Sequence, residues 1–264
     1  RNIGMHKLAA SFIFFTRLPL WRWVKVDASY YSRVVECWPA VGWLTGCFTA
    51  GVLWLLTLML SPLVAVTGAF AARVLLTGAM HEDGLADFFD GFGGGTTRER
   101  ILAIMKDSHI GTYGVLGLLF YFLILVGAVS SLPVNIACLA IIIGDPWCKF
   151  CSSQIINVLP YCRTAETAKN RTVYARMSPR ALFVDVVLGI VPLLAVSLIS
   201  GCATYSFLMS MISSCVMAAI VAMALFILMR NKIGGYTGDC CGATFLLSEL
   251  SFYLTFISLI TLYL

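Results

Sequence analysis

Charged side chains are scarce in this 264-residue sequence, in which Asp, Glu, Lys and Arg together make up 12% of the residues. Soluble domains carry about 25% charged residues, so the composition excludes an ordinary soluble domain. Hydrophobic residues reach 60% and the mean hydropathy is +0.91. These values indicate an integral membrane protein that is surrounded by membrane lipid.

Long polar stretches are missing from most of the chain. A transmembrane helix needs about 20 mostly apolar residues, and seven runs approach this length: 40–60, 63–80, 114–131, 134–150, 182–199, 204–229 and 243–264. Residues 7–20 are too short to span and predict an interfacial or re-entrant helix, and no small-residue cleavage site marks them as a removable signal. We therefore expect an all-α fold, a single polytopic transmembrane domain over 1–264 with about seven spans.

Charge is absent from three connections, at 61–62, 130–135 and 200–206. All 18 Lys and Arg residues except Arg73 and Lys149 lie in the N-terminal segment or in the loops 81–113, 151–181 and 230–242. Lys149 lies just before the second of these loops. Basic residues near span ends are retained in the cytoplasm. The pattern predicts that the N-terminus and these loops are cytoplasmic and that the C-terminus is outside.

Histidine is limited to three residues, His6, His81 and His109, which leaves few places for histidine catalysis. The ten cysteines lie mostly within or beside apolar runs and are typical of small core residues. Cys148 and Cys151 have the spacing of a redox or zinc motif, but no second cysteine pair or nearby histidine completes such a site. We expect them to belong to a helix at the membrane boundary.

Acidic residues are concentrated in the stretch GAMHEDGLADFFDGFGGGTTRER, residues 78–100. Residues 63–92 lack proline, and this predicts one long helix. At 100° per residue, Asp83, Asp87 and Asp90 share a narrow arc that excludes Glu82. Carboxylates on one face repel each other unless a cation lies among them, so the pattern favours Mg²⁺ or Mn²⁺ bound together with substrate phosphates. The alternative is a solvated helix end that is acidic without a metal.

Two other segments on the same predicted side of the membrane carry acids in a similar setting. IMKDSHIGTYG, residues 104–114, contains Asp107 next to Lys106, and GGYTGDCCGA, residues 234–243, contains Asp239 between glycines. Metal ligands, phosphate-binding cations and a permissive backbone from three loops together indicate a phosphoryl-transfer site.

Arg73 and Glu249 are charged residues inside predicted spans, where charges are rare. Arg73 lies ten residues before Asp83, and Glu249 lies early in the last span. We expect these two side chains to form a structural ion pair. The basic segment 163–180 could bind substrate phosphates, although basic loops that contact anionic lipid are common on the cytoplasmic side.

Four ordered blocks resemble those of a known family: FFTRLPL at 14–20, HEDGLADFFDG at 81–91, KDSHIGTYG at 106–114 and GGYTGDCCGA at 234–243. The sequence is similar to the polytopic cobalamin synthases, which are adenosylcobinamide-GDP ribazoletransferases of the late vitamin B12 pathway. The resemblance implies Mg²⁺-dependent transfer of the adenosylcobinamide phosphate group from adenosylcobinamide-GDP to α-ribazole or its 5′-phosphate, with release of GMP. It also implies an inner-membrane location.

The resemblance, together with the acidic pattern, gives expected roles for individual residues. The expected metal ligands are Asp83, Asp87, Asp90 and Asp107, and the expected catalytic carboxylates are Asp239, Asp107 and Asp83. The expected substrate-binding residues are Lys106, His109, Thr112, Gly111, Arg98, Arg100, Thr237, Gly238 and His81. No nucleic acid is expected as a partner, and the protein could form a homo-oligomer.

Two other functions fit part of the sequence. A CDP-alcohol phosphotransferase also holds metal with aspartates on membrane helices, but its pattern places an arginine where this chain has Asp87. A cation-coupled transporter uses carboxylates near the bilayer midplane on broken helices, whereas the acidic stretch here follows a complete predicted span.

Overall fold

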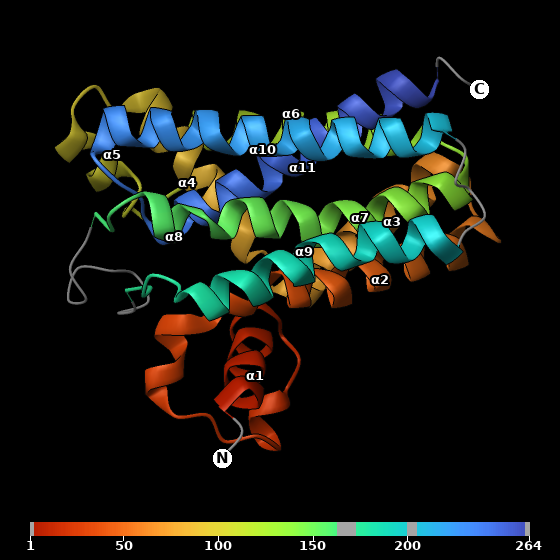
Figure 1. The fold of residues 1–264 in the computed structure, drawn as a ribbon. Helices are drawn as coiled ribbons and strands as arrows, with labels where there is room; N and C mark the ends of the chain where they lie inside the picture. The colour runs from red at the N-terminus through yellow and green to blue at the C-terminus, as the bar shows by residue number, and fades with distance from the viewer. Residues whose placement is uncertain (1–2, 163–172, 200–204, 262–264) are drawn as a thin grey trace.

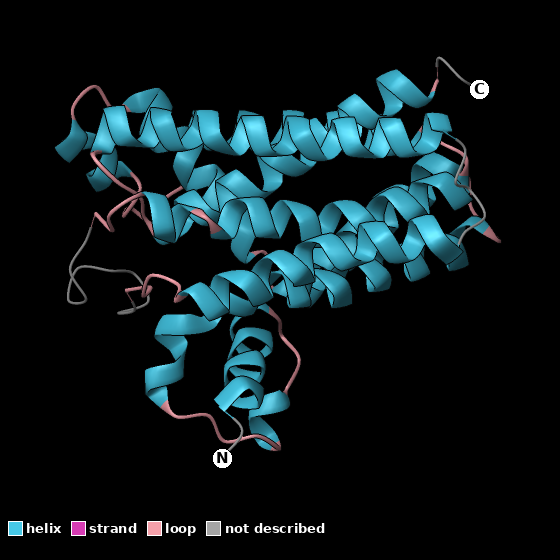
Figure 2. Ribbon diagram, viewed as in Figure 1, coloured by secondary structure: helices cyan, strands magenta, loops and turns pink. Residues whose placement is uncertain are grey.

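The computed structural model describes residues 3–162, 173–199 and 205–261, and Figure 1 shows these residues as helices joined by loops. Figure 2 shows no strand in the described part of the chain. A single isolated β-bridge there joins Tyr161 to Tyr236. The predicted all-helical class is confirmed.

Three groups of helices make up the described chain. The N-terminal group consists of α1 (Ile3–Phe15) and the 3-10 helices η1 (Leu20–Arg22) and η2 (Ala28–Cys37). The long helices are α2 (Trp38–Thr57), α3 (Pro62–Thr77), α6 (Thr112–Ser130), α7 (Val134–Ser153), α9 (Pro179–Ile199), α10 (Tyr205–Ile233) and α11 (Gly238–Ile260). The remaining helices are α4 (Met80–Gly94), α5 (Arg98–Ile104) and α8 (Ile155–Val158).

The long helices form the bundle that crosses the membrane. Six described segments are long and apolar enough to span it, and the number rises to seven if the bent pair of α3 and α4 counts as one span. α1 is not among these segments. In Figure 1 it lies outside the bundle, roughly perpendicular to the long helices. The prediction of a short N-terminal helix that does not span is therefore confirmed.

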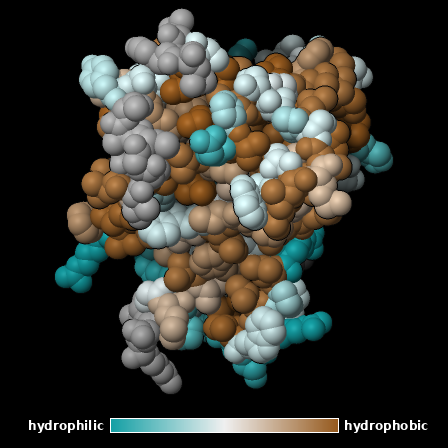
Figure 3. Space-filling model, turned by 90° about the vertical axis from the view of Figure 1, so that its right-hand side faces the viewer, coloured by the Kyte–Doolittle hydropathy of each residue, from teal (hydrophilic) through white to brown (hydrophobic). Residues whose placement is uncertain are grey.

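The two ends of the bundle differ in chemistry. The turns that precede α3 and α7 lie at the right of Figure 1, whereas α4, α5 and α8 lie at the left. Figure 3 views the right-hand end, most of which is apolar or weakly polar, with hydrophilic residues mainly in the lower part near α1. The charged loops of the described chain are thus gathered at the opposite end.

A sharp break separates α3 from α4. The two helices are bent by 93°, so the expectation of one helix over 63–92 is wrong. Gly78 has φ 67° and Ala79 has φ 58°, both in the left-handed region. A left-handed glycine is a common way to end a helix. As a consequence, α4 turns away from the direction of α3 and carries its acidic residues across the charged end of the bundle.

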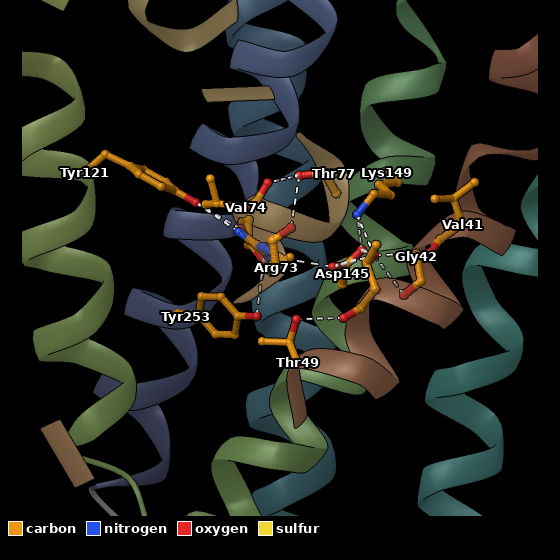
Figure 4. A network of polar contacts seen from close by, with 12 residues as sticks. Val41, Gly42, Thr49, Arg73, Val74, Thr77, Tyr121, Asp145, Lys149 and Tyr253 are labelled. Carbon is orange, nitrogen blue, oxygen red and sulfur yellow. Dashed lines mark hydrogen bonds and ion pairs between the residues drawn. The ribbon is translucent and has the colours of Figure 1, made fainter. Parts of the chain in front are cut away.

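Buried charges form a network inside the bundle (Figure 4). Arg73 Nη2 donates to Glu249 Oε2 at 2.9 Å, which confirms the predicted pair. Arg73 Nη1 also lies 3.6 Å from Asp145 Oδ2, and Asp145 forms an ion pair with Lys149. Tyr121 and Tyr253 donate their hydroxyls to Glu249 at 3.0 and 3.2 Å. The two cations and two anions therefore balance, as intramembrane charges must.

Lys149 departs from its predicted place. The charge pattern groups Lys149 with the basic residues at the cytoplasmic end of its span, but its side chain is fully buried within α7, one turn from Asp145. The hydropathy of the sequence cannot show whether this lysine is buried or exposed, because a lysine lowers the mean hydropathy of a segment equally in both cases. Lys149 Nζ also lies 3.0 Å from Thr45 Oγ1 of α2, so the lysine joins two spans.

We expect Arg73→Met and Glu249→Gln each to lower the free energy of unfolding by about 3–5 kcal/mol, because each change leaves a buried charge without its main partner. The double variant should cost less than the sum, since Asp145 and Lys149 then remain as a balanced pair. Denaturant titration in detergent, followed by tryptophan fluorescence, measures both effects.

Arg33→Met is the matched control, because half-buried Arg33 shares Glu36 with Lys7 and its loss leaves that pair intact. Its cost should stay below about 1 kcal/mol. Strictly additive costs for Arg73 and Glu249 would contradict the network.

Candidate active site

Three carboxylates meet at the charged end of the bundle. Asp83 and Asp87 lie one turn apart on α4, and Asp239 lies in the first turn of α11. Each offers a ligand atom, and the three atoms lie within 4.8 Å of one another. Asp83 is exposed, Asp239 is half-buried and Asp87 is buried, so the cluster has both a solvent side and a protein side.

Glycines allow this meeting of α4 and α11. A Cβ added at Gly84 would lie 2.9 Å from the backbone oxygen of Asp239, and one added at Gly242 would lie 3.0 Å from the backbone oxygen of His81. The two backbones therefore touch where any side chain would separate them. The space beside Gly84 is filled by the backbone of Asp239, so this glycine serves helix packing.

Asp90 lies apart from this cluster. Its carboxylate accepts the backbone N–H groups of Gly111 at 2.7 Å and Gly114 at 2.8 Å. These donors belong to the start of α6, where backbone N–H groups have no partner within the helix. A Cβ at either glycine would meet the Asp90 carboxylate. Asp90 is an expected metal ligand and Gly111 an expected substrate-binding residue. In this structure their hydrogen bond joins α4 to the start of α6.

Asp107 also lies outside the cluster. It is exposed, and Oδ1 accepts the backbone N–H of His109 at 3.0 Å and lies 2.7 Å from His109 Nδ1. These hydrogen bonds hold the pKa of Asp107 below its ordinary value. The neighbouring Lys106 and Thr112 are exposed as well. Asp107 is therefore not part of the carboxylate cluster, and the predicted site residues Lys106, His109 and Thr112 are exposed like Asp107 itself.

The other predicted substrate-binding residues fall in two places. Arg98 Nε donates to the backbone oxygen of Ile233 at 2.8 Å and so ties α5 to the end of α10, while Arg100 is exposed. Thr237 is buried at the start of α11, and its Oγ1 lies 3.4 Å from Asp239 Oδ2. Gly238 is half-buried and follows it directly. Thr237 and Gly238 therefore lie at the carboxylate cluster, and the two arginines lie farther along the same end.

His81 is buried beside the acidic cluster. Its ring packs against those of Phe15, Trp38 and Phe245, with centroids 5.1–6.0 Å apart. His81 Nε2 has no hydrogen-bond partner among the described residues. Such a site disfavours a charged imidazolium. A neutral ring here can still offer one nitrogen to a polar group that enters from the adjoining cavity.

A cavity of about 430 Å³ joins these elements. Asp83, Asp239 and His81 line it, together with residues at the end of α1 and just after it. The lining residues that the sequence did not predict for the site include Arg17, Tyr161 and Tyr174. Arg17 belongs to the block FFTRLPL, the one signal that could have indicated it. Residues 163–172, which contain much of the basic segment 163–180, lie outside the described residues.

The arrangement suits chemistry on a charged phosphate group. All three clustered ligands are carboxylate oxygens, which are the donors that Mg²⁺ and Mn²⁺ prefer. The cavity beside them has an arginine and several aromatic rings on its walls. Arginine matches phosphate geometry and aromatic rings stack on flat rings, so the cavity fits a ligand that contains both groups.

Comparison with known proteins identifies the family. A family model described as cobalamin-5-phosphate synthase matches residues 7–257. The adenosylcobinamide-GDP ribazoletransferase of Shewanella sp. (strain W3-18-1) is 38% identical over 245 residues, which cover 91% of this chain and 89% of the relative. That of Shewanella frigidimarina (strain NCIMB 400) is 35% identical over 262 residues, or 98% and 95% of the two chains. No solved structure matches the chain. The chain therefore belongs to the cobalamin-5-phosphate synthase family.

Proposed function

We propose that this enzyme transfers the adenosylcobinamide phosphate group from adenosylcobinamide-GDP to α-ribazole or α-ribazole 5′-phosphate and releases GMP. The names of its relatives support these substrates. The observation that carries the proposal is the cluster of Asp83, Asp87 and Asp239 at the edge of a cavity. A diphosphate donor needs a cation beside it, and this cluster is the place in the described chain where carboxylates can hold one.

Asp83, Asp87 and Asp239 would hold Mg²⁺. Their spacing and all-oxygen chemistry fit this ion. When bound, the ion neutralises charge on the phosphate oxygens that surround the reacting phosphorus. Asp90 and Asp107 lie outside the cluster, so we assign them no contact with the ion.

The chain's own residues would position the nucleophile and accept its proton. Asp239 lines the cavity whereas Asp87 does not, so we assign Asp239 to accept the proton of the acceptor hydroxyl. The hydroxyl oxygen forms a bond to the cobinamide-linked phosphorus. The bond from this phosphorus to the bridging oxygen breaks, and GMP leaves with the electron pair. Buried His81 and the aromatic rings around it exclude water from the inner wall of the cavity.

We place the site at the cytoplasmic face of the inner membrane. The N-terminal segment and the loops at this end carry all the basic residues of the chain except Arg73 and Lys149, and the turns at the other end of the described bundle carry none. Basic residues are retained in the cytoplasm. This location would also give the site access to a nucleotide-activated substrate.

Purified protein in detergent should release GMP from adenosylcobinamide-GDP and α-ribazole when Mg²⁺ is present. Asp87→Asn should lower the rate at least about 100-fold, because loss of a direct ligand should exceed the roughly 10–100-fold effect of changes around a metal site. Glu99→Gln, an exposed acid on α5, is the matched control and should keep the wild-type rate. Release of no GMP by folded wild-type protein would refute the reaction, whereas full activity of Asp87→Asn would refute the site.

Mn²⁺ can replace Mg²⁺ as a spectroscopic probe of the cluster. Asp83→Asn and Asp239→Asn should each weaken Mn²⁺ binding at least about 10-fold, as measured by the free-ion signal in electron paramagnetic resonance. Asp90→Asn should bind Mn²⁺ like the wild type but lose about 1–2 kcal/mol of stability, because one backbone N–H at the start of α6 loses its acceptor. If Asp90→Asn weakened Mn²⁺ binding while Asp83→Asn and Asp239→Asn did not, the assignment of the metal ligands would be contradicted.

Impermeant thiol reagents can test the orientation. Arg100→Cys should react in inverted membrane vesicles, and Ser131→Cys should react from the periplasmic side of intact inner membranes. Both residues are exposed and lie at opposite ends of the bundle. The wild-type chain with its ten cysteines supplies the background. The reverse pattern of labelling would place the site outside.

A further inference from the structure

Arg17 brings a positive charge to the cavity that Asp83 and Asp239 also line. It is the only Lys or Arg among the residues that line this cavity in the described chain. The residue is exposed, and its guanidinium forms no ion pair with any described residue. A full positive charge therefore faces the same space as Asp83 and Asp239 without being neutralised by either.

The backbone around Arg17 is held firmly in place. α1 ends as Thr16 Oγ1 donates to Phe12 O at 2.6 Å and accepts the N–H of Leu18 at 3.3 Å. The N–H of Arg17 then donates to the backbone oxygen of Leu76 at 2.7 Å. This bond fastens the segment after α1 to the last turn of α3, directly beside the break that leads into α4.

The side chain of Arg17 is positioned by a glycine. A Cβ added at Gly78 would lie 2.9 Å from Arg17 Cζ and 3.0 Å from Arg17 Cδ. The stem and guanidinium of Arg17 thus lie against the bare backbone of Gly78, which also has the left-handed φ that makes the break. The residue that turns α4 toward the site is therefore the same residue that leaves room for the arginine.

Charge balance gives this arginine a function. A diphosphate diester carries about two negative charges, and a single Mg²⁺ contacts only some of its oxygens. Phosphate oxygens that do not contact the metal need another cation. The planar guanidinium can donate two parallel hydrogen bonds to such oxygens, which an ammonium group cannot do.

We propose that Arg17 binds the diphosphate of the donor substrate within the cavity that Asp83 and Asp239 also line. The inference rests on the proposed function, because it assumes a diphosphate donor. It makes the N-terminal group part of the site, so the cavity is completed by a segment outside the transmembrane bundle.

The test compares Arg17→Gln and Arg17→Lys with the control Arg22→Gln, which removes an exposed arginine that does not line the cavity. Arg17→Gln should lower kcat/KM for GMP release roughly 10- to 100-fold, the range expected for loss of hydrogen bonds to a charged group. Arg17→Lys should recover part of this loss, because it keeps the charge but not the paired donors. Arg22→Gln should match the wild type.

Binding of pyrophosphate in the presence of Mg²⁺ gives a second readout that needs no turnover. Calorimetry on the full chain in detergent should show roughly 10-fold or greater weakening for Arg17→Gln and none for Arg22→Gln. Wild-type pyrophosphate affinity in Arg17→Gln would overturn the proposal, even if activity falls, because a purely structural role would then explain the loss.

The two proposals can fail separately. If the wild type binds pyrophosphate through Arg17 but releases no GMP, the reaction is wrong and the phosphate contact stands. If GMP is released normally by Arg17→Gln, the reaction stands and the contact is wrong. If Arg17→Gln does not fold, Arg17→Lys provides the test. Weakened pyrophosphate binding by the folded lysine variant would support the paired hydrogen bonds, and unchanged binding would refute them.

Discussion

The site depends on the direct contact between the backbones of α4 and α11. Like charges repel, so Asp83, Asp87 and Asp239 would separate if their helices were free to do so. Gly84 and Gly242 remove the side chains that would hold the helices apart, and the buried side chains of α11, such as Phe245 and Phe252, stabilise the packing. Apolar burial along the rest of α11 thus holds the carboxylates at a spacing that suits a divalent cation.

The break between α3 and α4 has an equally direct effect on the site. A straight helix over 63–92 would carry its acidic face out of the bundle, away from α11. The left-handed pair Gly78 and Ala79 instead turns α4 across the bundle end. Asp90 then reaches the start of α6 and fixes the far end of α4. One helix is thereby held at both ends, and its middle faces α11 and the cavity.

Local patterns in the sequence predicted much of this arrangement, and long-range contacts account for the rest. Asp83 and Asp87 lie one helical turn apart, so their shared face follows from periodicity, and the charge-free turns indicated which end would carry the site. Nothing local signals that Ala79 takes a left-handed conformation, since glycine is the residue that does so routinely. The bond between Asp90 and α6 likewise depends on how two distant helices pack. The burial of Lys149 also depends on packing, because its contact with Thr45 of α2 forms only when two distant helices meet.

An aromatic layer separates the buried charge network from the cavity. The ring of Phe245 lies 4.0 Å from Lys149 Nζ on one side and has its centroid 5.1 Å from that of His81 on the other. Arg73 and Lys149 balance Glu249 and Asp145 below this layer, so the network contributes no net charge to the cavity above it. Among the described residues that line the cavity, Arg17 supplies the positive charge, and the N-terminal segment places it there.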